Sequence, residues 1–355
     1  MDLDDRDRFK QIDADDMLGH IDALPEQLAD AWAHGHTLDM RPLRDGVRQI
    51  FICGMGGSAI SGDLLAALTA DTLSLPVFVN RSYTLPPYAA GPETLVIGLS
   101  HSGGTEETLS AVEQGIRRGA QTLAITTGGR LAEMVGQAGG GVIAYQYASQ
   151  PRAALGWLYG LLLAVLDRFG VVSLGRDVQE TVELMRRVRD ELKADVPIAH
   201  NPAKRLAGQL MGRVVVVWGA GILEPVARRW KTQINENAKT AAYYEGLPEL
   251  NHNSVVGTIY PEDGVRRLGV VQLISRRHDH PRVQLRQDAT GDLLLQEAIL
   301  NDRVYAAGES RLANQLSLIQ YGDYVSYYLA MSYEVDPTPI PQIAALKARM
   351  AEAGK

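Results

Sequence analysis

The feature that most constrains the fold is an apolar run that breaks into a glycine-rich turn and reopens as a helix. Residues 51–65, FICGMGGSAISGDLL, show it first, and residues 213–221, RVVVVWGAG, repeat it in the second half of the chain. Around both turns, short runs rich in β-branched and aliphatic residues alternate with segments of helical length. This alternation predicts an α/β fold with parallel βαβ units and two open, doubly wound sheets. The two halves are predicted to be a diverged duplication.

The expected elements group into five parts. We expect strands at 47–54, 75–80, 94–100, 121–127, 141–147, 213–221, 267–275 and 302–308. We expect helices within 9–40, at 58–69, between the turn at 101–108 and Gly119, and at 153–166, 176–195, 222–240 and 311–336, with a turn at 199–204 and an irregular loop at 243–257. The expected parts are an N-terminal helical segment (1–40), a first sheet domain (41–172), a helical linker (173–204), a second sheet domain (205–335) and a C-terminal helix (336–355).

Length and composition agree with a two-domain globular chain. The 355 residues are long for one core, and 46% are hydrophobic while 22% are charged. The net charge of −7 argues against a nucleic-acid partner, and the acidic N-terminus is unlike a secretory signal. The longest apolar stretch, 153–166, falls short of the ~20 residues that cross a membrane. The single cysteine, Cys53, lies in an apolar run and is predicted to be a buried hydrophobe, so we expect a cytoplasmic protein without disulfides or a membrane partner.

The first glycine turn admits a dinucleotide as ligand. Residues 54–59, GMGGSA, fit the G-x-G-x-x-G/A fingerprint. That fold needs an acidic residue about 20 positions further on, at the end of the second strand, to hold a ribose hydroxyl. Here the second strand ends in Asn80 and Arg81. Because glycines at any strand-to-helix turn produce this pattern, an NAD-dependent oxidoreductase is the least favoured interpretation.

A second turn combines glycines with several hydroxyls. Residues 100–108, SHSGGTEET, follow the expected strand 94–100 and open a helix. Hydroxyl donors add to the free N–H groups of a helix start, and the helix dipole favours a dianion, so we predict a cradle for a phosphomonoester. The alternative is a helix cap, which accounts for one hydroxyl but not for three. The predicted phosphate-binding residues are Gly56, Gly57, Ser58, Ser100, Ser102 and Thr105.

Five motifs together resemble a known family. They are GMGGSAISGD (54–63), SHSGGTEET (100–108), QPRAALG (150–156), WKTQINENAK (230–239) and PELNHN (248–253). In this order they resemble the bifunctional phosphoglucose/phosphomannose isomerases, built from two sugar-isomerase (SIS) domains of flavodoxin-like architecture. The resemblance runs from about residue 15 to the C-terminus. It implies an aldose–ketose isomerase that interconverts glucose 6-phosphate or mannose 6-phosphate with fructose 6-phosphate through a cis-enediol, as a homodimer without metal or cofactor.

Two residues are expected to move protons. Glu236 is the only acid in NENAKT, and it matches the catalytic glutamate of the family; a carboxylate can move a proton between C1 and C2 on one face of an open-chain sugar. The alternative is a solvated helix carboxylate paired with Lys231 or Lys239. His252 lies in a segment without helical or strand periodicity and suits ring opening near neutral pH. The resemblance implies that it enters the site of the neighbouring subunit; the alternative is a loop histidine bonded to backbone.

Three further residues are assigned to the site. Arg152 follows a proline at the start of the buried helix, where a guanidinium can face oxyanion charge, or else form a helix-end salt bridge. Lys347 falls in the C-terminal helix, where the family carries an active-site lysine; the alternative is a solvated helix face. Thr338 is a weaker candidate for contact with the sugar C2 region.

Some positions depart from the family pattern or resemble other sites. His101 and Gly104 stand where the family more often has an aromatic residue and an asparagine, which bears on loop rigidity and phosphate affinity. An imidazole at 101 would add a cation to the phosphate site or, the favoured alternative, is packed or exposed. His278 and His280 flank Asp279 with metal-like spacing but lack a third partner nearby, so we expect no metal.

Two other function classes compete with an isomerase. A regulatory SIS protein that senses a phosphosugar shares the cradle, but it has no need of Glu236 and His252. An amidotransferase isomerase such as glucosamine-6-phosphate synthase needs an N-terminal cysteine nucleophile, and this chain starts with MDLDDR.

Overall fold

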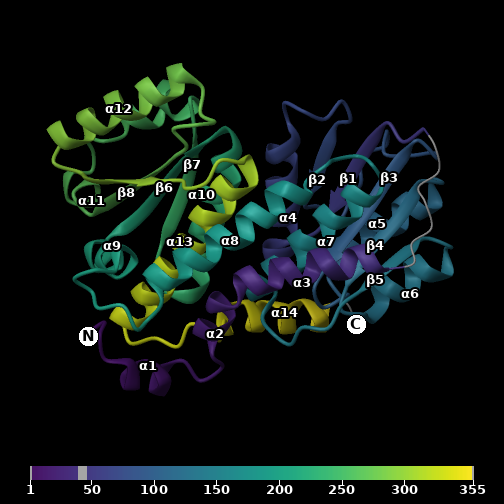
Figure 1. Cartoon of the computed structure of the whole chain (residues 1–355), viewed down its shortest axis with the longest axis horizontal. Coiled ribbons are helices and arrows are strands. Elements are labelled where there is room, and N and C mark those ends of the chain that lie inside the picture. Colours follow the sequence, from purple (N-terminus) through teal and green to yellow (C-terminus); the bar gives the residue numbers. More distant parts are fainter. Residues whose placement is uncertain (1, 39–45, 354–355) are drawn as a thin grey trace.

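Two parallel sheets form the frame of the molecule, as the repeated turn predicts (Figure 1). The computed structural model describes residues 2–38 and 46–353. The first sheet has the strand order β2-β1-β3-β4-β5 and the second has the order β7-β6-β8-β9; the strand pairs in both are parallel. In each sheet the chain starts on an inner strand, moves to one edge and then crosses to the other side. This is the doubly wound, flavodoxin-like order.

The elements have the following bounds. The strands are β1 Gln49–Cys53, β2 Val77–Asn80, β3 Thr94–Ser100, β4 Gln121–Thr126, β5 Gly141–Ala144, β6 Val214–Ala220, β7 Ala242–Leu247, β8 Leu268–Ile274 and β9 Leu300–Tyr305. The α-helices are α1 Arg6–Ile12, α2 Met17–Asp22, α3 Leu24–Thr37, α4 Gly56–Thr69, α5 Glu106–Arg117, α6 Gly129–Gln137, α7 Leu155–Arg168, α8 Gly175–Leu192, α9 Pro202–Leu210, α10 Glu224–Asn237, α11 Glu262–Val265, α12 Pro281–Gln296, α13 Arg311–Ser332 and α14 Pro341–Ala353. Short 3₁₀ helices are η1 Pro151–Ala153, η2 Gly221–Leu223, η3 Glu249–His252 and η4 Ser254–Val256.

The sequence prediction is wrong at two places in the second half. The expected irregular loop at 243–257 begins with β7, an edge strand whose central residues are partly or fully exposed, so that they lack a continuous apolar run. The expected turn at 199–204 contains the start of α9, where the Asn201 side chain accepts hydrogen bonds from two backbone N–H groups and Pro202 occupies the first helical position. Helices α6 and α12 also lie where no element was assigned. The expected boundary at residues 40 and 41 lies outside the described residues.

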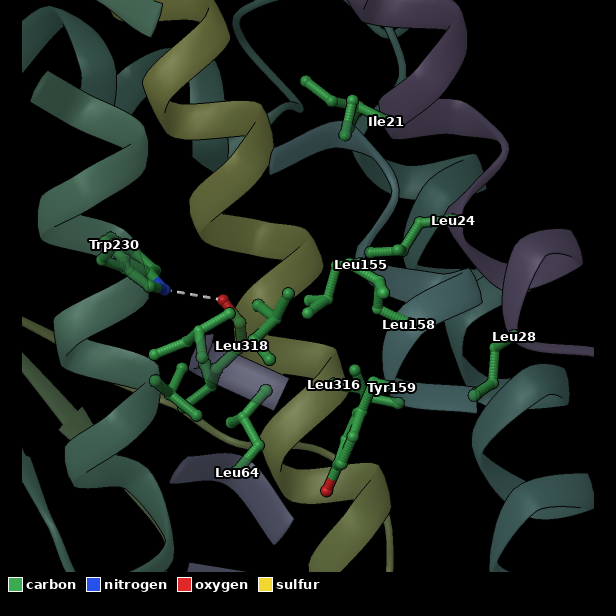
Figure 2. Close-up of a cluster of buried hydrophobic side chains, with 14 of the residues drawn as sticks. Ile21, Leu24, Leu28, Leu64, Leu155, Leu158, Tyr159, Trp230, Leu316 and Leu318 are labelled. Carbon is green, nitrogen blue, oxygen red and sulfur yellow. Dashed lines mark hydrogen bonds between the residues drawn. The ribbon is translucent and has the colours of Figure 1, made fainter. Parts of the chain in front are cut away.

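Two long buried helices form the centre of the molecule. The prediction of a buried helix near 153–166 is confirmed by α7, and almost all of α13 is buried as well. Figure 2 shows α13 between α10 and α7, with Trp230 donating a hydrogen bond to the carbonyl of Leu318 at 2.7 Å. Small residues let α3 approach α7 closely: a Cβ on Gly160 would lie 2.7 Å from the Cβ of Ala31. These contacts tie the N-terminal helices to the first sheet.

Two observations concern membrane-spanning helices and the single cysteine. None of the helices in the described residues combines the length and hydrophobicity that crossing a membrane requires. Cys53 is buried at the end of β1, as predicted, and burial raises the pKa of its thiol to about 12. The thiol is therefore protonated at neutral pH and packs as a small apolar group.

Candidate active site

Two loops meet at the carboxyl ends of β1 and β3. In the first, Gly56 has φ +47° and begins α4, and the Ser58 hydroxyl accepts a hydrogen bond from the backbone N–H of His101 at 3.4 Å. In the second, the hydroxyls of Ser100 and Thr105 lie 3.1 Å apart, and the exposed Ser102 hydroxyl accepts from the N–H of Gly104 at 3.3 Å. We call Gly56, Gly57, Ser58, Ser100, Ser102 and Thr105 the cradle. Carboxyl ends of adjacent parallel strands are where ligands bind in such folds.

His101 is a packed link rather than a solvent-exposed cation. Its ring nitrogens lie 2.8 Å from the Tyr145 hydroxyl and 3.1 Å from the Ser149 carbonyl. Burial lowers the pKa of this imidazole, so it is neutral near pH 7. His101, which stands where the family more often has an aromatic residue, is therefore also a ring, and it links the loop after β3 to the segment before α7.

Arg152 connects the cradle to the second half of the chain. A Cβ on Gly57 would lie 2.9 Å from the Cα of Arg152, so only glycine permits this approach. The Arg152 side chain is 3% exposed, and its guanidinium donates to Asn237 Oδ1 at 2.8 Å and to the carbonyls of Pro337 and Thr338 at 2.8 Å each. Its Nη1 lies 3.3 Å from Glu236 Oε2. Burial lowers the pKa of Arg152, while the Glu236 charge opposes that shift.

Glu236 lies in the last turn of α10 and faces Arg152. Its side chain is 24% exposed, so it lies neither in bulk solvent nor in a closed core. The predicted alternative, a helix carboxylate paired with a neighbouring lysine, does not describe its contacts, because Lys239 donates to the backbone carbonyl of Glu236 at 2.6 Å. The partial negative charge at a helix C-terminus disfavours a carboxylate, and Arg152 offsets this effect. The structure thus brings together the cradle, Arg152 and Glu236.

Lys239 belongs to this site, although the sequence indicated it only as a possible partner of Glu236. It follows α10 in a left-handed backbone conformation, with φ +54°, and its Nζ also donates to the Pro337 carbonyl at 3.0 Å. Burial, and secondly the positive charge of Arg152, lower the pKa of Lys239 to about 8. Lysine at this place therefore changes charge just above neutral pH. The signal that could have identified it is its position three residues after Glu236 in the same motif.

Thr338 lies in the same region as Arg152. It is buried, its carbonyl accepts from Arg152, and its hydroxyl has no hydrogen-bond partner among the residues that the structure describes. An unpaired buried hydroxyl can bond a ligand without giving up an internal partner.

His252 and Lys347 are not brought to Glu236 within one chain. His252 is exposed at the end of η3, and in the described part of the chain its ring makes no hydrogen bond or ion pair. Lys347 is exposed on α14, whose residues 341–352 are all exposed. Figure 1 shows α14 along the lower edge of the molecule.

The histidine pair at 278–280 has other contacts. The His278 ring lies 3.0 Å from the Glu309 carbonyl, and the His280 ring accepts from the N–H of Arg282 at the start of α12. Asp279 is buried and accepts from Ser275 and Gln287. Across residues 2–38 and 46–353, no three His, Cys, Asp or Glu side chains gather as metal ligands would.

The fold and the site define a protein of two SIS domains. Residues 46–133 match the family model described as SIS domain, and residues 199–350 match the model described as bacterial phospho-glucose isomerase C-terminal SIS domain. Among solved structures, a hypothetical protein from Thermus thermophilus superposes with a TM-score of 0.72 at 16% identity, covering 96% of this chain and 91% of that one. The tagatose-6-phosphate ketose/aldose isomerase of Escherichia coli superposes with a TM-score of 0.69 at 16% identity, covering 92% of this chain and 96% of that one. These two likenesses show the shared fold.

Sequence relatives identify the family. The bifunctional phosphoglucose/phosphomannose isomerase of Caldicellulosiruptor bescii is 41% identical over 331 residues, covering 93% of this chain and 97% of the relative. The protein of the same name from Aquifex aeolicus is 36% identical over 299 residues, covering 84% and 89%. The chain belongs to the bifunctional phosphoglucose/phosphomannose isomerase family.

Proposed function

We propose that this chain is a sugar-phosphate isomerase that interconverts glucose 6-phosphate and mannose 6-phosphate with fructose 6-phosphate. The relatives described above are named as enzymes of both activities. The observation that carries the proposal is the position of Arg152, which pairs with Glu236 while its backbone lies against Gly57 of the cradle. A phosphate held in the cradle places the rest of a six-carbon sugar toward this ion pair.

In the proposed mechanism, the cradle holds the phosphate and Glu236 moves one proton. The Glu236 carboxylate takes the proton from C2 of the open-chain aldose and returns it to C1. Between these two transfers the hydroxyl proton passes from O2 to O1, which leaves the C2 carbonyl and the C1 hydroxyl of the ketose. Charge develops on the cis-enediolate between these steps, and the Arg152 guanidinium, whose side chain is 3% exposed, stabilises it. Thr338 contacts the C2 region. Because a carboxylate and a guanidinium supply the proton transfer and the balancing charge, the mechanism requires no metal.

Two side chains that do not lie near Glu236 in the structure, His252 and Lys347, complete the proposed site. His252 opens the sugar ring in the site of a second subunit, so we propose a homodimer. Lys347 reaches the site of its own chain when α14 packs along it. The exposed apolar side chains Ile343, Leu346 and Met350 share one helix face with Lys347, and α14 begins three residues after Thr338. Packing of this face would bury the lysine together with the apolar stripe.

The experiment that tests the function follows both products from fructose 6-phosphate, with and without EDTA. We expect glucose 6-phosphate and mannose 6-phosphate to form at rates that chelation leaves unchanged. Binding of fructose 6-phosphate without turnover would instead identify a phosphosugar sensor. Loss of turnover with EDTA would overturn the metal-free mechanism.

The charge of Lys239 predicts how activity depends on pH. Lys239 is protonated at pH 7, and its charge, close to Arg152, favours the enediolate. As the pH rises through about 8 this charge is lost, so kcat/KM is expected to fall with an apparent pKa near 8. Lys239→Gln should have a low kcat/KM without this alkaline fall, and Lys239→Arg should keep activity to higher pH.

The control for this pH profile is Lys231→Gln, which removes a lysine from α10, the helix that Lys239 follows. Its profile should match that of the unmodified enzyme. An unchanged alkaline fall in Lys239→Gln would assign the titration to another group.

A further inference from the structure

Several features of the two halves of the chain correspond as an internal two-fold axis would relate them. The turns after β1 and β6 correspond, since Gly56 has φ +47° and Gly221 has φ +49°. Asp63 lies seven residues after the first glycine, and Arg228 lies seven residues after the second. These equivalent residues pair with each other at 2.9 Å. Equivalent residues that contact each other lie on a two-fold axis, so α4 and α10 pack around one.

This axis gives the ion pair of the candidate active site a counterpart. Glu236 lies fifteen residues after Gly221, and Asp71 lies fifteen residues after Gly56. Arg152 lies in η1, three residues before the buried helix α7 begins at Leu155, and Arg311 is the first residue of the buried helix α13. The Arg152–Glu236 pair is 3.3 Å long, and the Arg311–Asp71 pair is 2.8 Å long. The counterpart lies at the carboxyl end of α4.

The turn after β6 lacks the hydroxyl that Ser58 provides in the cradle. Ile222 and Leu223 follow Gly221 where Gly57 and Ser58 follow Gly56, and both side chains are buried. At this turn the position of Ser58 therefore holds Leu223, an apolar residue that offers no hydroxyl to a phosphate. The Arg311–Asp71 pair is therefore retained, while the residues of the neighbouring turn differ from those of the cradle.

Arg311 is less fully bonded than Arg152. The Nε of Arg152 donates to Asn237, whereas the equivalent position holds Thr72, whose hydroxyl donates to the Thr69 carbonyl. Within the described ranges, the buried Nε of Arg311 has no hydrogen-bond acceptor. A buried donor without a partner costs free energy. An anion that replaces Asp71 and lets the guanidinium turn toward the cavity can supply the missing acceptor.

Arg311 lines a cavity of about 430 Å³. Its other walls come from the turn after α4, including Thr72 and Leu73, from the segment that joins α7 to α8, including Val172 and Ser173, and from Asp177 in the first turn of α8. The volume suits a small metabolite. We infer that this cavity is a second ligand site, in which Arg311 binds the carboxylate or phosphate group of a small hydroxylated anion.

The charges around the cavity narrow the class of ligand. Asp71, the present partner of Arg311, is 73% exposed on its side chain and can move into solvent when an anion replaces it. Asp177 stays on the wall, so the part of the ligand that faces it must donate hydrogen bonds rather than carry charge. A hydroxy acid or the phosphate ester of a small polyol has both properties, whereas a dicarboxylate does not.

The test is binding calorimetry on the full chain with two probes, gluconate and glycerol 3-phosphate. We expect at least one of them to bind at a site whose affinity falls about tenfold or more in Arg311→Gln, since a hydrogen bond to a charged group is lost. The KM for fructose 6-phosphate should not change in this variant. The probe that loses affinity tells whether the site prefers a carboxylate or a phosphate.

Two further variants keep the inference falsifiable. Ser173→Trp fills the cavity from an exposed position and should abolish the same binding, even if Arg311→Gln does not fold. Arg117→Gln removes an exposed arginine that is paired with Glu113, and it should bind both probes as the unmodified chain does. Binding that survives both Arg311→Gln and Ser173→Trp, or binding of neither probe, would overturn the inference. Binding of glycerol 3-phosphate to the cradle can be distinguished from binding to the cavity. Ser100→Ala should weaken binding to the cradle, whereas Arg311→Gln should not.

Discussion

Replacing Glu236 by glutamine is expected to lower kcat about 10²- to 10⁴-fold for both aldose phosphates, the usual contribution of a positioned acid–base group. The amide has nearly the shape of the carboxylate, and its oxygen can still accept from Arg152 Nη1. It cannot take a proton from C2. We therefore expect kcat to fall while KM for fructose 6-phosphate changes little, because the phosphate is held in the cradle. Steady-state kinetics with fructose 6-phosphate as the substrate, in which the formation of glucose 6-phosphate and mannose 6-phosphate is followed separately, measure both quantities.

The control for this variant is Glu113→Gln. Glu113 also pairs with an arginine, Arg117, but at 3.8 Å on the exposed face of α5. Its loss should leave kcat unchanged. Thermal unfolding of both variants checks that the loss of a buried ion-pair partner has not unfolded the site. Isomerisation at the original rate in Glu236→Gln would remove this residue from the role of base.

The local signals in the sequence predicted the frame and the positions of the two turns that carry the cradle residues. The strand expected at 94–100 coincides with β3, and the helix expected from Ser58 is α4, which begins two residues earlier. Apolar runs that end in glycine turns are local features, and the hydroxyls of the cradle are close in sequence. Such features can be interpreted without knowledge of distant contacts.

Other features depend on contacts between distant parts of the chain. Strand β7 lies at the edge of its sheet, where exposed positions need not be apolar, so its sequence resembles a loop. The link from Arg152 to Glu236 joins residues far apart in sequence, and the lowered pKa of Lys239 depends on its burial beside Arg152. The sequence indicated a diverged duplication, but the equivalence of Arg152 and Arg311 became visible only through their ion pairs.

The proposed second subunit would account for the exposed position of His252. Several exposed apolar side chains follow it, with Val256 71% and Tyr260 76% exposed. Large apolar side chains gathered on a surface are typical of an interaction site. A face of this kind around His252 suits contact with another copy of the chain, which would carry the imidazole into the neighbouring site.

Mixing two inactive variants is expected to restore activity if His252 serves the partner's site. Glu236→Gln and His252→Gln should each be impaired alone, the second about 10²-fold where ring opening limits the rate. In a mixed dimer, one site combines both substitutions, and the other combines Glu236 of one chain with His252 of the other. With random exchange of subunits, about a quarter of the original activity should return, because half of the dimers are mixed and each has one intact site.

The measurement is the rate of glucose 6-phosphate formation after the two variants are unfolded and refolded together, compared with each variant refolded alone. A mixture of Glu236→Gln with Glu236→Gln,His252→Gln is the matched control, since it never creates an intact site and should stay inactive. If His252 acted in its own chain, the mixed dimer would contain no intact site, and the activity would remain the average of the two separate variants. That outcome would show that ring opening takes place within one subunit, and that catalysis does not require the surface around His252 to contact a second copy of the chain.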